Sequence, residues 1–318
     1  MSRVARALGA LTLGALAACY ALPPAPPPAR PVRFLHVNDL RRTDSFPDGM
    51  GGLARLAGVR RRLLEVGSTL FVASGDLLDP EAGGAAAARR RIELFNAAGL
   101  DYATFGERDL ALPADTVNAL LAASTFRWLS ANCQLKDGNP LDAVQPWDTV
   151  RALRRLDQLP PFPTGPGAPK PPTREQLQKA YTQALGRAAK VGIFAVSPPG
   201  DYGWVTCGDP VEAAKLAVDQ LVATKADLIV ALTHLDLATD LRILRADGRL
   251  DLILGGNTTA AVDSTSANRH VLKADPDGRS AQFATLWGAQ AAWRSATRLI
   301  PITRDLAADS TLLARLAR

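Results

Sequence analysis

The chain has 318 residues, and 47% of them are hydrophobic, which is enough to bury a large core. A net charge of +6 and an isoelectric point near 9.5 would suit a nucleic-acid partner. However, arginines cluster in the short runs 60–62 and 89–91, inside predicted amphipathic helices, where solvated helix faces explain them better. We therefore expect one α/β domain and no nucleic-acid partner.

The N-terminus has the pattern of a targeting signal. A positively charged start precedes an uncharged apolar stretch over residues 8–18, which is too short to span a bilayer. Residues 16–19 read Leu-Ala-Ala-Cys, and a cysteine in this context resembles the lipobox of bacterial lipoproteins. We therefore predict a signal peptide over residues 1–18 and a lipidated Cys19. An ordinary signal peptide is the alternative.

Proline dominates the segment that follows the cysteine. The density of proline in residues 23–31 favours an extended spacer, so we predict a linker over residues 19–32. In the Gram-negative lipoproteins that this pattern resembles, an aspartate after the cysteine is the usual sign of retention in the inner membrane, and Tyr20 stands at that position instead. We therefore expect a cell-envelope protein that is lipid-anchored to the outer membrane and faces the periplasm.

Short β-rich runs then alternate with segments of helical periodicity. Strands are predicted at residues 33–37, 69–73, 102–105, 128–131, 191–196, 228–232 and 250–254, with helices between most of them. Such alternation is typical of parallel strands with helical crossovers. The later runs 271–273, 282–287 and 297–302 are predicted as strands without intervening helices. We expect a two-layer β-sandwich flanked by helices, as a single α/β domain over residues 33–307 with a C-terminal tail at 308–318.

One long segment, residues 134–190, interrupts this pattern. Seven prolines lie between positions 160 and 172, and a helix is predicted over residues 174–187. A loop of this length is usually a lid, a partner site or a disordered excursion, so we regard it as an insert and a candidate surface for a protein partner. Cys133 and Cys207 either pair as a disulfide or remain buried small hydrophobes, and both alternatives stay open.

Polar residues follow five of the predicted strands. In an open α/β sheet the ligand site lies beyond the carboxyl ends of the strands, so we expect these segments to converge. They are Asn38-Asp39, Gly75-Asp76, Gly106-Glu107-Arg108-Asp109, Thr233-His234 and Gly255-Gly256-Asn257-Thr258-Thr259. Each segment by itself is also compatible with an ordinary turn or helix cap.

The order of these segments is more specific than any one of them. The sequence blocks that carry it are Phe-Leu-His-Val-Asn-Asp at 34–39, Gly-Gly-Leu-Ala-Arg-Leu at 51–56, Ser-Gly-Asp at 74–76, Asn-Ala-Ala-Gly-Leu-Asp at 96–101, Leu-Ser-Ala-Asn at 129–132, Ala-Leu-Thr-His at 231–234 and Asp-Leu-Ile-Leu-Gly-Gly at 251–256. This succession resembles the 5'-nucleotidase branch of the calcineurin-like metallophosphoesterases, from about residue 33 to residue 305 apart from the insert. The resemblance implies that fold and two divalent ions, commonly manganese or zinc, that bind a phosphate ester and activate water.

Only part of the family's ligand set is retained. The resemblance carries over Asp39, Asp76 and His234 as metal ligands, with Asp76 as the bridging carboxylate. Five other family positions are replaced, by Arg41, Glu107, Arg108, Asn257 and Thr259. Because a guanidinium cannot ligate, the ion that Asp39, Arg41, Asp76 and Thr259 would surround is expected to be absent. Asp76, Glu107, His234 and Asn257 can each donate oxygen or nitrogen, so we expect at most one divalent ion.

Two arginines stand where the family has histidines. Either their fixed charge has replaced a lost cation, or the substitutions are drift in an arginine-rich protein, and both interpretations stay open. On the first interpretation, Arg41 and Arg108 form an anion site: Arg41 pairs with Asp39 and Asp76, while Arg108 contacts the ligand. Arg108, at the leaving-group position, and Asp39 are the candidate catalytic residues.

Three functions follow from this site. The leading hypothesis is an envelope lipoprotein that is impaired in two-metal hydrolysis and binds a phosphate-bearing or other anionic small molecule. The second is an active single-metal phosphoric ester hydrolase with Asp39 or Asp76 as the base. The third is a non-catalytic scaffold whose partner surface is the insert. The family's base-binding C-terminal domain has no counterpart in this sequence, so nucleotide specificity is not expected.

Overall fold

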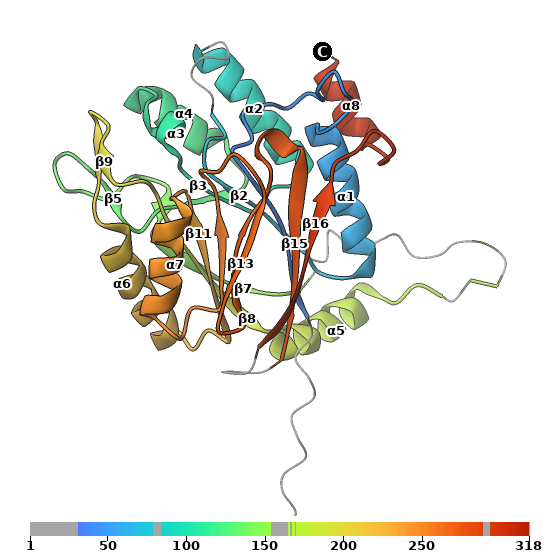
Figure 1. Ribbon diagram of the computed structural model, residues 1–318. Helices are drawn as coiled ribbons and strands as arrows, with labels where there is room; N and C mark the ends of the chain where they lie inside the picture. Colours follow the sequence, from blue (N-terminus) through green and yellow to red (C-terminus); the bar gives the residue numbers. More distant parts are fainter. Residues whose placement is uncertain are drawn as a thin grey trace, which may run out of the picture.

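The computed structural model describes residues 31–78, 84–153, 165, 167–168, 170–288 and 293–317. The predicted signal peptide, Cys19 and nearly all of the predicted linker lie outside these residues, as does part of the proline-rich segment. The described chain contains two large β-sheets packed face to face, with helices on both outer sides (Figure 1).

The first large sheet has seven strands in the order β16-β15-β1-β2-β3-β4-β6. Its strands are β1 (Val32–Asn38), β2 (Leu70–Ser74), β3 (Tyr102–Thr104), β4 (Arg127–Leu129), β6 (Val144–Gln145), β15 (Ser280–Trp287) and β16 (Arg294–Pro301). The strands from β1 to β6 run parallel, and β15 pairs antiparallel with β1 and β16. The carboxyl ends of β1, β2 and β3 therefore meet at one edge.

The second large sheet has six strands in the order β13-β14-β12-β11-β8-β7. Its strands are β7 (Trp147–Arg151), β8 (Lys190–Val196), β11 (Leu228–Thr233), β12 (Leu252–Gly255), β13 (Val262–Ser266) and β14 (Arg269–Lys273). The four strands from β14 to β8 run parallel. A small third sheet joins β5 (Cys133–Leu135), β10 (Val205–Cys207) and β9 (Gly200–Asp201).

Helices cover the outer face of each large sheet. The first sheet is covered by α1 (Leu53–Val66), α2 (Gly84–Ala98), α4 (Ala114–Ala123) and α8 (Ser310–Leu316), and the second by α6 (Pro210–Ala223) and α7 (Leu237–Ala246). Along β1, Phe34 contributes to the core between the sheets, whereas Leu35 contributes to the core beneath the helices. This alternation follows from the two-residue period of a strand that is buried on both faces.

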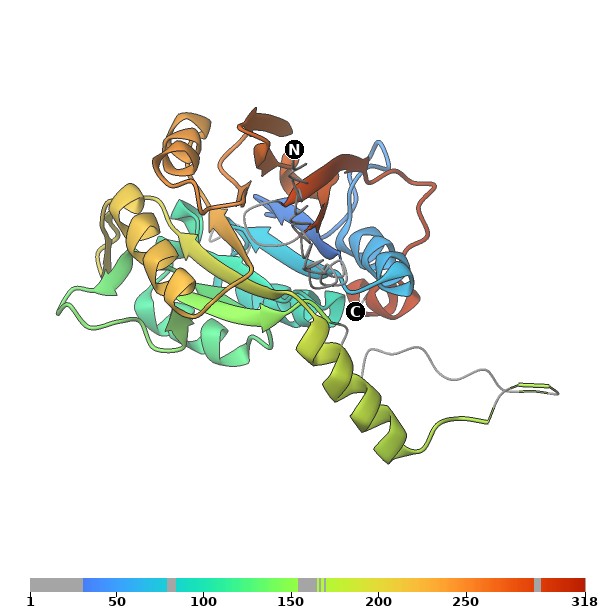
Figure 2. The same cartoon turned by 90° about the horizontal axis from the view of Figure 1, so that it is seen from below.

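The observed layers confirm the predicted two-layer sandwich with flanking helices. The segment predicted as an insert contributes β5, β6 and β7 to the sheets, and it contains helix α5 (Arg174–Arg187) at the predicted residues. Helix α5 extends away from the sheets and has no buried residue (Figure 2). The predicted tail contains α8, which packs Leu312 against the core.

One expectation about the arginine runs was wrong. Arg61 and Arg62 are exposed as predicted, but Arg91 is buried, with 7% of its surface accessible.

In the part of the chain that the structure describes, we find no helix with both the length and the apolar character needed to cross a bilayer.

Candidate metal centre

The predicted site residues lie at the carboxyl ends of neighbouring parallel strands. Asp39 follows β1, Asp76 follows β2, and Glu107 begins the short helix α3 (Glu107–Leu110) after β3. In the second sheet His234 follows β11 directly. Because the two sheets face each other, these four strand ends bring their side chains to one place, as the sequence order predicted.

Asp39, Asp76 and His234 form a buried group whose potential ligand atoms all lie within 4.8 Å of one another. The Nε2 atom of His234 lies 3.8 Å from Asp39 Oδ1, 3.7 Å from Asp76 Oδ1 and 3.1 Å from Glu107 Oε2. The other ring nitrogen, Nδ1, donates to the carbonyl oxygen of Ser74 at 2.9 Å. Such a bond fixes the ring with Nε2 toward the carboxylates, which is how metal-binding histidines are usually oriented.

The backbone at this centre is held in an unusual conformation. Asp39, Asp76 and Asn257 have φ values of 50°, 54° and 53°, in the left-handed region that is costly for most side chains but best tolerated by Asp and Asn. Backbone strain of this kind clusters at functional sites. The strained residues here are three of the predicted metal ligands.

Asn257 follows Gly256 after β12 and is exposed. The backbone at Gly256 lies so close to the centre that a Cβ atom there would overlap the Ser74 carbonyl and the His234 ring. Thr259, at a position where the resemblance implied a histidine, is also exposed.

The electrostatics of the centre are those of a site that attracts a cation. Burial opposes the charge on His234, but the hydrogen bond to Glu107 and the charges of Asp39 and Asp76 raise its pKa to about 9. Burial is also the main cause that raises the pKa of Asp76. An imidazolium therefore balances the carboxylates when no ion is bound, and a divalent cation would displace its proton.

Asp109 connects two of the loops that carry the centre, a role that the sequence analysis did not assign to it. Its buried carboxylate accepts hydrogen bonds from the amides of Leu77 at 2.9 Å, Leu78 at 2.6 Å and Gly106 at 2.8 Å. Burial and then the charge of Asp76 raise its pKa to about 7. Asp109 thus ties the loop that follows Asp76 to the start of α3. A sequence signal existed, because Asp109 belongs to the polar run after β3.

The two arginines have partners that differ from those predicted. Arg41 pairs with Asp277 at 3.1 Å, not with Asp39 and Asp76. Burial opposes the charge on Arg41, but Asp277 outweighs it and raises its pKa, with smaller contributions from Asp39 and Asp76. Arg108 is the arginine beside Asp76: its backbone amide donates to Oδ1 at 3.1 Å, and its Nε lies 3.7 Å from Oδ2. The predicted division of roles is therefore wrong about the partner of Arg41.

The two remaining histidines have no place in the cluster. His36 is buried in β1, and its Nε2 lies 3.1 Å from Ser74 Oγ. His270 lies in β14, where its Nδ1 contacts Asp263 at 2.7 Å.

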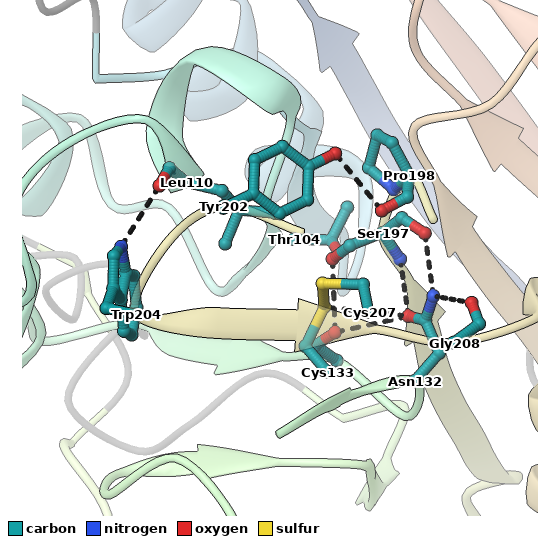
Figure 3. Close-up of a disulfide and its surroundings, with 11 residues drawn as sticks. Thr104, Leu110, Asn132, Cys133, Ser197, Pro198, Tyr202, Trp204, Cys207 and Gly208 are labelled. Atoms are coloured by element: carbon teal, nitrogen blue, oxygen red, sulfur yellow. Dashed lines mark hydrogen bonds between the residues drawn. A yellow bond between two sulfur atoms is a disulfide. The ribbon is translucent and has the colours of Figure 1, made fainter. Parts of the chain in front are cut away.

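Cys133 and Cys207 form a disulfide between β5 and β10, which settles the alternative left open by the sequence. The preceding residue, Asn132, donates to the carbonyls of Ser197 at 2.8 Å and Gly208 at 3.0 Å (Figure 3). The hairpin of β9 and β10 also carries Trp204, whose indole donates to the carbonyl of Leu110 at 3.1 Å. The disulfide therefore secures a hairpin that contacts the end of α3.

Neither a protein-family model nor a curated protein matches the sequence of this chain. Solved structures do match its fold. A calcineurin-like phosphoesterase of Bacillus subtilis, YfkN, aligns over 92% of this chain and 96% of its own, with a TM-score of 0.70 and 17% identity. A 5'-nucleotidase precursor of Thermus thermophilus aligns over 91% of this chain, with a TM-score of 0.67 and 18% identity.

A third similar structure is the sulfate thiohydrolase SoxB of Thermus thermophilus, which aligns over 93% of this chain with a TM-score of 0.69 and 16% identity. The match spans 58% of the Thermus nucleotidase and 61% of SoxB. At these identities the likeness concerns the fold. This chain therefore has the fold that calcineurin-like phosphoesterase and 5'-nucleotidase structures share.

Proposed function

We propose that this chain binds one divalent metal ion at the candidate metal centre and, through it, a phosphate-bearing or other anionic small molecule. The observation that carries the proposal is the buried convergence of Asp39, Asp76 and His234 from three strand ends. Efficient two-metal hydrolysis fits these residues poorly, because Arg41 stands at a family ligand position and holds Asp277.

The donor set fits a single ion such as manganese or zinc. Carboxylate oxygens of Asp39 and Asp76, with an imidazole nitrogen of His234, are ligands that such ions accept. Glu107 Oε2 lies 3.1 Å from Nε2 of His234 and can contribute a further oxygen. We propose that Asn257, the residue after Gly256, supplies its side-chain amide as another ligand. A bound ion would supply Lewis-acid attraction for an anionic oxygen. The three carboxylates also carry enough negative charge to balance a dication.

Arg108 is the residue best placed to contact the anion. Its side chain is 37% exposed while Asp76 beside it is 9% exposed, so the guanidinium lies at the rim of the centre. A cation on Asp76 would compete with Arg108 for the same carboxylate. The guanidinium would then turn toward an anion on the metal, where it can bind in bidentate geometry.

Calorimetric titration with MnCl2 and ZnCl2, followed by thermal-shift measurements with phosphate and sulfate, tests the proposal. We expect one equivalent of metal and a phosphate-dependent rise in melting temperature that depends on the metal. Asp76→Asn and His234→Gln should abolish both effects. The matched controls Asp263→Asn and His270→Gln alter the surface pair in β13 and β14 and should change neither.

The alternatives give other outcomes. Turnover of p-nitrophenyl phosphate with one metal equivalent, lost in Asp39→Asn, would establish the single-metal hydrolase instead. Absence of both metal binding and an anion-dependent shift would leave the scaffold hypothesis.

We propose further that the protein is lipid-anchored at the cell envelope, in the outer membrane facing the periplasm. The support is the lipobox-like sequence at Cys19 and the proline-rich stretch after it. Cys19→Ser should move the protein out of the membrane fraction or leave an unprocessed precursor. Normal processing with retention on the membrane would refute the anchor.

A further inference from the structure

Two buried cationic side chains contact the loops that carry the candidate metal centre. Arg91 contacts loops of the first large sheet, and Lys273 contacts loops of the second. Lys273, at the end of β14, is 1% exposed, and its Nζ lies 2.8 Å from Oδ2 of Asp240 in α7, which is fully buried. Arg91, in α2, is 7% exposed. Lysine and arginine are almost never this buried unless their charges are compensated.

Lys273 joins the two loops of the second sheet that reach the centre. Its Nζ donates to the carbonyl of Leu235 at 2.5 Å and to the carbonyl of Gly256 at 2.6 Å. Leu235 is the residue after His234, and Gly256 is the residue before Asn257. The Asp240 carboxylate compensates the charge of the ammonium as an ion pair.

Arg91 does the same for the first sheet. Its Nε donates to the carbonyl of Leu77 at 2.8 Å, and its Nη2 donates to the carbonyl of Leu40 at 2.5 Å. Leu40 is the residue after Asp39, and Leu77 is the residue after Asp76. Each cation therefore connects two strand-end loops through carbonyls that lie next to site residues.

The hydrogen bonds of Arg91 and Lys273 are unusual in where they are made. Carbonyls at the ends of strands are ordinarily satisfied by water or by turns. The carbonyls beside this centre instead accept hydrogen bonds from the long side chains of Arg91 and Lys273, which belong to other elements. A buried ion pair such as Lys273 with Asp240 adds little net stability compared with an apolar pair of similar volume. What such a pair can supply is a fixed geometry of the loops that it connects.

We propose that Arg91 and Lys273 are positioning residues that hold the four loops of the metal centre in pairs: Arg91 sets Asp39 against Asp76, and Lys273 sets His234 against Asn257. This inference rests on the proposed function insofar as the positioned residues bind a metal ion. Supporting groups around a metal site typically change its affinity by about 10- to 100-fold when they are removed.

The test uses the variant Arg91→Met and the double variant Lys273→Met/Asp240→Asn, which removes both charges of the buried pair so that no carboxylate is left unpaired. Arg269→Met is the matched control, because Arg269 donates to the carbonyls of Leu244, Asp247 and Leu250 at the other end of β14. Should Arg91→Met not fold, Arg91→Lys keeps the charge but loses the forked geometry.

Two measurements are made on the full chain: Mn2+ affinity by calorimetry and amide hydrogen exchange. We expect both positioning variants to weaken Mn2+ binding about tenfold or more. We also expect faster exchange at residues 39–41 and 76–78 for Arg91→Met, and at 234–236 and 256–258 for the double variant. Arg269→Met should speed exchange only near residues 244–250 and leave Mn2+ affinity unchanged.

Wild-type affinity in the positioning variants, or an equal loss in Arg269→Met, would overturn the proposal. If the wild-type protein binds no Mn2+, the proposed function fails, and hydrogen exchange decides the positioning claim by itself. Unchanged exchange at the four loops would then refute it, whereas local acceleration at the named residues would support it.

Discussion

His36 is predicted to make the folded protein sensitive to acid. Ser74 Oγ donates to the carbonyl of Leu254 at 2.7 Å, so it accepts from His36 Nε2, and the proton of the neutral ring resides on Nε2. The other nitrogen, Nδ1, is buried without a hydrogen-bond partner among the described residues. A second proton on Nδ1 would therefore be a buried, unpaired charge. Burial, reinforced by the charge of Lys273, accordingly lowers the pKa of His36 to about 3.

The number of protons bound by the folded and unfolded states decides how the free energy of unfolding changes with pH. Below pH 6.5 the unfolded chain binds a proton at His36 that the folded chain does not bind, so the free energy of unfolding falls as the pH falls. A pKa of about 3 in place of 6.5 corresponds to about 5 kcal/mol when the pH is below both values. At pH 5 the loss is about 2 kcal/mol.

The assay is urea unfolding of the wild type and of His36→Gln at pH 7.5 and pH 5. Glutamine can keep a donor near Ser74 but cannot titrate. Asp240 and Asp251, whose pKa values burial raises to about 6, favour the folded state as the pH falls, but they are present in both proteins. The wild type should lose about 2 kcal/mol more than the variant between the two pH values. Parallel losses would refute the reasoning.

Three further predictions concern the centre and its surroundings. Because His234 has a pKa of about 9 and must lose its proton to ligate, Mn2+ affinity measured by calorimetry should rise about tenfold per pH unit between pH 6 and pH 8; a flat profile would contradict this. Replacing Cys133 and Cys207 by serine opens a cross-link with a sequence separation of 74 and should cost about 4 kcal/mol in urea unfolding; an unchanged midpoint would show that the disulfide adds nothing. Asn257→Gly should weaken Mn2+ binding with little change in stability, whereas Asn268→Gly, at a similar φ of 62° in the β13–β14 turn, should leave binding intact; equal affinities in the two variants would exclude the Asn257 amide as a ligand.

The fold was largely predictable because its signals are local. Strands such as β8 and β11 are continuous apolar runs, and the intervening helices have clear periodicity. Strand β13 was missed because Val262–Ser266 is a polar, half-exposed edge strand with no hydrophobic pattern. Tertiary pairing with β14, which no local signal reveals, decides its conformation.

The candidate site was predictable only where its residues end strands. Asp39, Asp76 and His234 could be placed together from the order of the blocks, because parallel strands share one carboxyl edge. The partner of Arg41 could not be predicted, since Asp277 lies 236 residues further along the chain, in a short 3-10 helix between β14 and β15. Arg91 was hidden in a run of arginines whose other members are not buried.

The most direct test of the single-ion centre is the metal content of protein purified without chelators, measured by mass spectrometry for the wild type, His234→Gln and His270→Gln. The proposal predicts one equivalent of divalent metal in the wild type and in His270→Gln, and none in His234→Gln. Two equivalents accompanied by strong phosphatase turnover, or no binding even after incubation with Mn2+ and Zn2+, would contradict it.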